Sequence, residues 1–358
     1  MEVKVVVGAN YGDESKGLVS GCLAREAAEK GNKILTVFFN GTSQRAHSFE
    51  GVTRHFMAAG ENYSSDTFYH RMFVVDPIML WLSKSTPIID PRCRVIFPCD
   101  VLYGQAREKQ VKHGSCGFGL FAAVKRYEKC EYYFQVEDFF LPDKYFYSAV
   151  QKVDNFYNYK PNEIHNMRNF LSAIKWVKEN CRIIEFEELI KKESYDTIIY
   201  EGGQGLLLSQ ENMGDFPHLT PSSTGAYNIH NDIEKLNAKV DLFYVSRSYM
   251  TRHGLGPMDM EVSKENINPL IYDEVNQPND WQGSLRFGRI DMQKLYKRIK
   301  GDAARYNCNK TINMVYTHLN YTDGYIAALD NKIDIVRPDF ITNVYGSDRK
   351  DFMEKIKV

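Results

Sequence analysis

The sequence lacks the features that would place it in a membrane or in an oxidising compartment. Its 358 residues contain no run near the ~20 apolar residues of a membrane span, and residues 1–7 lack the basic and apolar regions of a signal peptide. The seven cysteines form no CxxC pair and are odd in number, which disfavours both a zinc site and a complete disulfide framework. We expect a soluble protein of the cytoplasm, or of the host cytoplasm if the source is viral, with reduced thiols.

An excess of charge of one sign is also missing. Lys and Arg number 45 against 46 Asp and Glu, for a net charge of −1, so no basic stripe tracks a polynucleotide backbone. We therefore expect nucleotide monomers rather than nucleic-acid polymers as partners. No repeat and no linker rich in Gly, Pro or Ser interrupts the chain, which predicts one domain over residues 1–358.

Short apolar runs alternate with helical patterns along the chain. Residues 3–7 form a β-branched run that ends at Gly8, an apolar-periodic stretch covers residues 18–27, and Gly31 follows as a helix C-cap would. A second buried strand is predicted at residues 33–39, giving a βαβ unit. Similar strand patterns lie at residues 94–97, 197–200, 242–245 and 312–316, and the best helix at residues 162–180. This alternation predicts an α/β fold with a mostly parallel central sheet flanked by helices.

The segment GANYGDESKG, which starts at Gly8, lies where the first strand passes into the first helix. Its backbone N–H groups and the helix dipole are expected to converge on an anion, with Lys16 supplying positive charge. The segment is not the common phosphate loop GxxxxGK[ST], because Gly17 follows Lys16 and Asp13 lies inside the loop. A glycine-rich turn without a ligand is the alternative interpretation.

Further motifs follow in an order that resembles the adenylosuccinate synthetase family. GDESKG is similar to the family's GDEGKG, and SQRAHS at residues 43–48 stands where the family has HNAGHT. HGSCGFG at 113–119 resembles IGTTGRG, YEGGQG at 200–205 resembles FEGAQG, residues 220–223 resemble TSSN, and TRHGLGP at 251–257 is similar to TRVGAGP. The resemblance extends over nearly the whole chain and implies the family's P-loop-related fold.

The resemblance implies a C–N ligase that works in two steps. A nucleoside triphosphate phosphorylates the 6-oxygen of a purine monophosphate, and the amine of L-aspartate then displaces that phosphate. Asp13 can take the N1 proton and bind Mg²⁺, while His47 and Lys16 can stabilise the transferring phosphoryl group. The alternatives are that Asp13 is a helix N-cap and that His47 is structural.

The resemblance also assigns the site residues to catalysis and to the individual ligands. The catalytic group is Asp13, His47 and Lys16. The purine monophosphate is assigned to Asp13, Gln44, Ser115, Cys116, Gln204, Thr220 and Arg126. The triphosphate is assigned to Gly12, Glu14, Ser15, Lys16, Gly17, Ser48, Asn320 and Gly346, the aspartate to Thr251, Arg286 and Arg289, and Mg²⁺ to Asp13 and Ala46. A homodimer is implied, with Arg126 as the candidate that reaches the neighbour's acceptor phosphate or, alternatively, an intramolecular surface arginine.

Departures from the family pattern bear on the choice of nucleotides. The family reads guanine with an aspartate where THLN ends in Asn320, and an amide can face adenine. We therefore expect ATP, or relaxed choice, over strict use of GTP. The rebuilt acceptor motifs resemble a bacteriophage branch that uses dGMP or GMP to make 2-aminoadenine. Several members of that branch are expected to carry a small residue at the position of Asp13, yet a carboxylate can itself read guanine.

Two other interpretations stay open. One is an ordinary adenylosuccinate synthetase that uses IMP and GTP. The other is a non-catalytic nucleotide-binding protein, against which the joint retention of Asp13, Lys16, His47 and Gln204 argues. A phosphate-loop kinase or GTPase is disfavoured because GK[ST] and an intact guanine motif are both missing.

Overall fold

The computed structural model describes residues 1–42, 47–111, 114–157, 164–273, 276, 283–322, 340–343 and 354–357. A nine-stranded sheet runs through it in the order β16-β15-β14-β10-β1-β9-β2-β5-β7. The strands are β16 (Glu354–Lys357), β15 (Phe340–Asn343), β14 (Lys310–Thr317), β10 (Val240–Arg247), β1 (Glu2–Gly8), β9 (Thr197–Gly205), β2 (Ile34–Phe38), β5 (Ser65–Tyr69) and β7 (Ile88–Ile89). All neighbours are parallel except β15 and β16, which confirms the predicted fold class.

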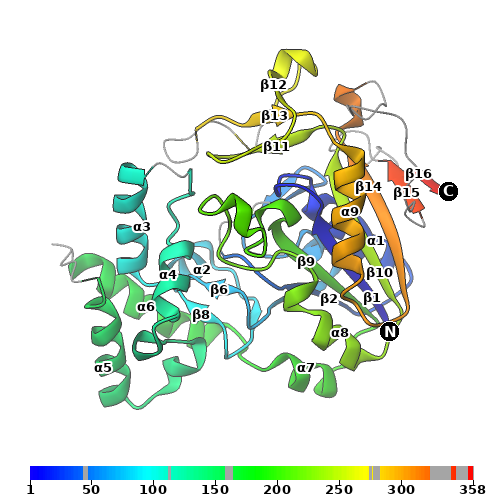
Figure 1. The fold of residues 1–358 in the computed structure, drawn as a ribbon. Helices are drawn as coiled ribbons and strands as arrows, with labels where there is room; N and C mark the ends of the chain where they lie inside the picture. The colour runs from blue at the N-terminus through cyan, green and yellow to red at the C-terminus, as the bar shows by residue number, and fades with distance from the viewer. Residues whose placement is uncertain are drawn as a thin grey trace.

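Helices cover both faces of this sheet (Figure 1). Successive side chains of β1 point to opposite faces of the sheet. Val6 packs with α1 (Lys16–Glu29) in one buried cluster. Val5 packs in another cluster with α7 (Phe186–Lys192), α8 (His230–Leu236) and α9 (Met292–Ala303). Because both faces are buried, the central strands are continuously apolar rather than alternating. The result is a helix–sheet–helix sandwich.

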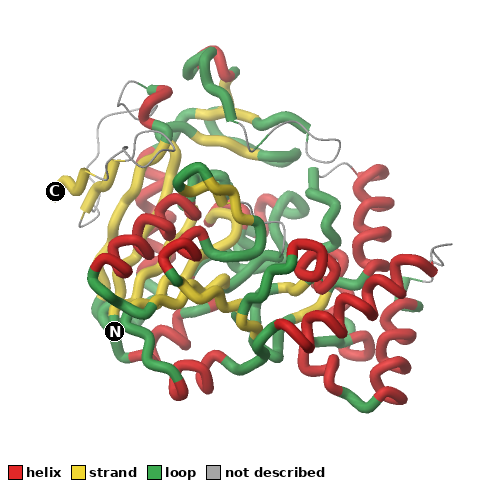
Figure 2. Tube along the Cα trace, turned by 180° about the vertical axis from the view of Figure 1, so that it is seen from behind, coloured by secondary structure: helices red, strands yellow, loops and turns green. Residues whose placement is uncertain are grey.

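A second core lies beside the β5 and β7 edge. Its helices gather away from the other helices, as the views from both sides show (Figures 1 and 2). They are α2 (Pro77–Ser83), α3 (Pro98–Val111), α4 (Leu120–Tyr127), α5 (Asp143–Asp154) and α6 (Ile164–Asn180). Phe97, Phe134 and Phe170 are fully buried there. None of the helices in the described ranges combines the length and the apolar composition of a membrane span.

Three small sheets complete the described strands. β3 (His47–Phe49) pairs with β4 (Val52–Arg54), β6 (Val74–Val75) with β8 (Arg94–Val95), and β13 (Arg286–Gly288) lies between β11 (Met250–Arg252) and β12 (Glu261–Val262). The run at residues 94–97 was expected in the central sheet, but β8 pairs with β6 in a separate two-stranded sheet. The predicted βαβ unit is confirmed, since β1, α1 and β2 follow one another and the two strands run parallel. In the sheet, however, β9 lies between β1 and β2.

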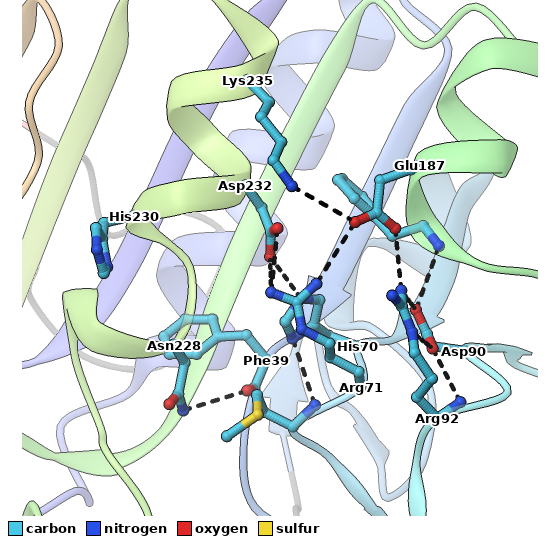
Figure 3. A network of polar contacts seen from close by, with 12 residues as sticks. Phe39, His70, Arg71, Asp90, Arg92, Glu187, Asn228, His230, Asp232 and Lys235 are labelled. Carbon is cyan, nitrogen blue, oxygen red and sulfur yellow. Dashed lines mark hydrogen bonds and ion pairs between the residues drawn. The ribbon is translucent and has the colours of Figure 1, made fainter.

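A partly buried polar network ties the edge strands to α7 and α8 (Figure 3). Asp232 lies 2.8 Å from Nε2 of His70 and 3.0 Å from Arg71, and Arg92 makes a bidentate contact with Asp90. Burial alone would raise the pKa of Asp232, but His70 and Arg71 together outweigh it and lower that pKa. This network therefore needs an ionised Asp232.

Candidate functional site

The glycine-rich loop follows β1 at the carboxyl edge of the sheet, where ligands bind in open α/β folds. Within the loop, Glu14 is 3% exposed, and its carboxylate accepts from the backbone N–H of Asn10 at 3.0 Å and of Gly12 at 2.9 Å. Nζ of Lys16 donates to the Gly12 carbonyl and lies 3.8 Å from Glu14 Oε2. Burial raises the pKa of Glu14, although Lys16 and the N–H donors oppose it. The Glu14 carboxylate thus binds backbone N–H groups of its own loop. Its side chain therefore points into the loop rather than toward a triphosphate.

Asp13 lies on the open side of the same loop. Its side chain is 33% exposed, and Oδ2 lies 3.6 Å from Nε2 of His253. The backbone oxygen of Asp13 accepts from Arg247. The N-cap of α1 is Ser15, with a positive φ, so the alternative that Asp13 is the helix cap is wrong. The carboxylate is available to a ligand or a cation.

His47 is held against the start of α1. Its Nε2 lies 3.1 Å from Oε1 of Glu201, which is fully buried and also accepts from the Ser20 hydroxyl. A Cβ added to Gly17 would lie 2.2 Å from Nδ1 of His47, and a Cβ on Gly21 would lie 2.7 Å from the Phe49 ring. Two glycines one helical turn apart therefore make the groove that seats the β3–β4 hairpin.

The loop after β9 lies directly on the glycine-rich loop. Gln204 has φ 63°, and a Cβ on Gly12 would lie 2.8 Å from its Oε1. The Asn40 amide fixes this loop by accepting from Gly203 N at 2.6 Å and donating to Gly203 O at 3.0 Å. The backbone of Thr220 donates to Leu208 O at 2.9 Å. Gln204 is exposed beside the glycine-rich loop.

The segment expected to receive the acceptor phosphate meets the loop after β11. A Cβ on Gly114 would lie 2.3 Å from the Cα of Gly254. Ser115 and Cys116 are both partly exposed. Burial raises the pKa of Cys116 to about 11, so the thiol stays neutral at physiological pH and can donate a weak hydrogen bond. The cysteine therefore adds no negative charge that would repel a phosphate.

The side chain of Arg126 is buried. It is 1% exposed and makes two hydrogen bonds with the Asp100 carboxylate, at 2.9 and 2.8 Å. It also donates to the backbone oxygens of Tyr132 and Val95. A guanidinium with this many buried partners is structural, so both its assignment to acceptor phosphate and the alternative of a surface arginine are wrong.

Of the residues assigned to aspartate, Thr251 lies in β11 and Arg286 in β13, and Arg289 directly follows β13. Arg286 pairs with Glu261 and donates to the carbonyls of Gly254 and Gly256 at 3.0 and 2.9 Å. Arg289 is exposed, and Thr251 is 3% exposed. In this arrangement Arg286 fixes the loop after β11, whereas Arg289 presents its side chain to solvent.

The remaining assignments are scattered. Ser48 is exposed and its hydroxyl lies 2.8 Å from that of Thr53. Asn320 is exposed in the short helix η8 (Leu319–Tyr321), which follows β14. Gln44, Ala46 and Gly346 lie outside the described residues. Within the described ranges, no group of three or more His, Cys, Asp or Glu side chains could hold a metal by itself, whereas Mg²⁺ commonly takes one or two carboxylates together with substrate phosphates. Asp13 fits that pattern.

Several site residues had no sequence assignment. These are Glu201, Arg247, His253, Asp273 and Arg298. Arg298 comes from α9 and donates to Ala9 O at 3.0 Å and to Asn10 Oδ1 at 2.6 Å, and its burial lowers its pKa to about 10. Glu201 lies within the motif YEGGQG, which could have marked it. Arg298 belongs to an ordinary helical pattern that gives no such signal.

A family model for adenylosuccinate synthetase matches residues 79–298. The chain belongs to the adenylosuccinate synthetase family. The adenylosuccinate synthetase of Blochmanniella pennsylvanica is 26% identical over 304 residues, which cover 74% of this chain and 66% of the relative. That of Clostridium botulinum is 26% identical over 296 residues, covering 74% and 67%. The chain thus spans about two thirds of the length of these curated relatives.

Two solved structures share the fold. Fully ligated adenylosuccinate synthetase from Plasmodium falciparum superposes with a TM-score of 0.69 at 18% identity, covering 89% of this chain and 77% of that one. Succinoaminodeoxyadenylate synthetase of cyanophage S-2L, bound to dGMP and to dATP as an energy donor, gives 0.58 at 12% identity, covering 98% and 94%. These likenesses establish a shared architecture.

Proposed function

We propose that this protein is a ligase that joins L-aspartate to C6 of a purine nucleoside monophosphate through a 6-phosphoryl intermediate. The observation that carries the proposal is the placement of His47. The buried Glu201 carboxylate holds its ring against Gly17, one residue after Lys16. Asp13 lies open in the same loop. A proton acceptor, a cation and an oriented imidazole therefore meet at one edge of the sheet.

The chemistry follows from these positions. The Asp13 carboxylate takes the N1 proton of the purine, and the 6-oxygen attacks the γ-phosphorus while the nucleoside diphosphate leaves. His47 donates to the phosphoryl oxygens, where negative charge builds up, and Lys16 adds positive charge. The aspartate amine then adds at C6, and the phosphate departs with the original 6-oxygen. Mg²⁺ held by Asp13 and Ala46 would neutralise charge on the triphosphate.

We further propose GMP or dGMP as acceptor, giving a 2-aminoadenylosuccinate, and ATP as phosphoryl donor. Asn320 supports ATP, because an amide lacks the pair of acceptor oxygens with which a carboxylate holds guanine. The cyanophage likeness supports the acceptor, since it extends over 98% of this chain and 94% of a protein bound to dGMP and dATP. The family pattern also implies a homodimer, whose crossing residue must be one other than Arg126.

The test offers IMP, GMP and dGMP separately, with Mg²⁺, aspartate and either ATP or GTP, and identifies products by mass. A succinyl adduct of GMP or dGMP formed with ATP is the expected result. Reaction of IMP with GTP alone would make the protein an ordinary adenylosuccinate synthetase. Nucleotide binding without any adduct would indicate a non-catalytic nucleotide-binding protein.

A further inference from the structure

His253 lies between the two parts of the acceptor site. Its Nε2 is 3.6 Å from Oδ2 of Asp13 and 3.1 Å from Oδ1 of Asn276. The next residue, Gly254, packs against Gly114 at the start of the segment assigned to the acceptor phosphate. A nucleotide that reaches from that segment to Asp13 therefore passes His253.

The neighbours of this imidazole indicate which nitrogen carries the proton. Both atoms near Nε2 are oxygens that accept hydrogen bonds, so Nε2 is the donor and a neutral ring leaves Nδ1 as an acceptor. Nδ1 is buried and has no hydrogen-bond partner among the described residues. A buried acceptor without a donor is unfavourable. A ligand that brings a donor would satisfy it.

A chain of hydrogen bonds and ion pairs connects the partner of the His253 ring, Asn276, to Asp13. The side chain of Asn276 donates to Asp273 at 2.9 Å, and Asp273 pairs with Arg247 at 2.6 Å. Arg247 in turn donates to the backbone oxygen of Asp13. Burial alone would raise the pKa of Asp273, but Arg247 and Asn276 outweigh it and lower that pKa well below its usual range. His253 and Asp13 therefore share one rigid support.

The two groups beside N1 of the purine, at C6 and at C2, determine which one lies near His253. If Asp13 takes the N1 proton, the 6-oxygen lies on one side of N1 and the C2 substituent on the other. His47 and Lys16 lie at the helix end of the loop. The proposed function assigns them to the 6-oxygen and its phosphoryl group, which leaves the C2 side to His253. Guanine carries an amino donor at C2, whereas hypoxanthine carries only a C–H.

We propose that Nδ1 of His253 accepts a hydrogen bond from the 2-amino group of the acceptor, which makes His253 a specificity-determining residue for guanine nucleotides. The inference rests on the proposed function and deepens it. The motif TRHGLGP has this histidine where the family pattern TRVGAGP has valine, a side chain that cannot accept a hydrogen bond.

The test compares GMP with IMP, which differ only at C2, in the wild-type protein and in His253→Val. The ratio of kcat/KM for GMP to that for IMP should fall by roughly tenfold, the factor of about one hydrogen bond, chiefly through loss of activity on GMP. His253→Asn keeps an acceptor oxygen and should retain part of the preference. His230→Val on α8 is the matched control and should leave the ratio unchanged.

An equal loss of kcat for both acceptors, with the ratio preserved, would overturn the proposal and reduce His253 to a support for Asp13. If His253→Val is inactive, the dissociation constants of GMP and IMP measured by calorimetry give the same ratio, and an unchanged ratio again overturns it. Failure of the wild-type protein to form any succinyl adduct would instead refute the proposed function, and the binding ratio would still test His253.

Discussion

Gly17→Ala should disable the enzyme without weakening the fold. The new Cβ would lie 2.2 Å from Nδ1 of His47 and 2.6 Å from its Cβ and Cγ, whereas ordinary contact begins at 3.4 Å. The ring must therefore retreat by roughly 1 Å, a displacement that costs on the order of a hundredfold in rate when a reacting group is involved. Gly17 has no positive φ, so alanine suits the helix.

The assay measures aspartate-dependent phosphate release together with urea unfolding. We expect kcat to fall about a hundredfold, with little change in the KM for ATP. The free energy of unfolding should fall by no more than the cost of displacing the His47 ring. Gly301→Ala is the matched control, since Gly301 lies in α9 with nothing within 4 Å of the added Cβ. That variant should keep full activity and gain about 0.5–1 kcal/mol of stability. Full activity in Gly17→Ala would refute the role given to His47.

Three further changes probe other contacts. Glu201→Gln should lower kcat by roughly tenfold to a hundredfold, because His47 loses its charged partner; stopped-flow turnover checks this, and unchanged kcat contradicts it. Arg126→Ala should cost about 3–5 kcal/mol in urea unfolding, since the buried Asp100 loses its opposite charge; an unchanged midpoint would show that the pair is dispensable. The lowered pKa of Asp232 stabilises the fold above its unfolded pKa and ceases to do so as pH falls through the folded one. Wild type should therefore lose more unfolding free energy than Asp232→Asn between pH 5 and pH 3, and parallel losses would contradict this.

The sequence predicted the central architecture because buried parallel strands are continuous apolar runs. The strands that became β1, β2, β9, β10 and β14 were placed within a few residues. It failed at residues 94–97, where an apolar run of the same composition pairs with β6 in a separate small sheet. The insertion of β9 between β1 and β2 also had no local signal, since strand order depends on contacts between distant residues.

The candidate site was predictable where loops follow strands and unpredictable where partners come from afar. Asp13, Lys16 and Gln204 lie together because their loops leave adjacent strands at one edge of the sheet. Arg126 could not be judged, because its burial depends on Asp100 in another helix. The spacing of Gly17 and Gly21 did carry a readable signal, since two glycines four residues apart on a helix favour close packing.

The measurement that tests the central claim most directly follows the 6-oxygen of the acceptor. GMP labelled with ¹⁸O at that position is incubated with ATP, Mg²⁺ and aspartate, and the released phosphate is analysed by mass. A 6-phosphoryl intermediate predicts that the label passes into phosphate in step with formation of the succinyl adduct. Unlabelled phosphate, or phosphate released at the same rate without aspartate, would contradict the proposed ligase.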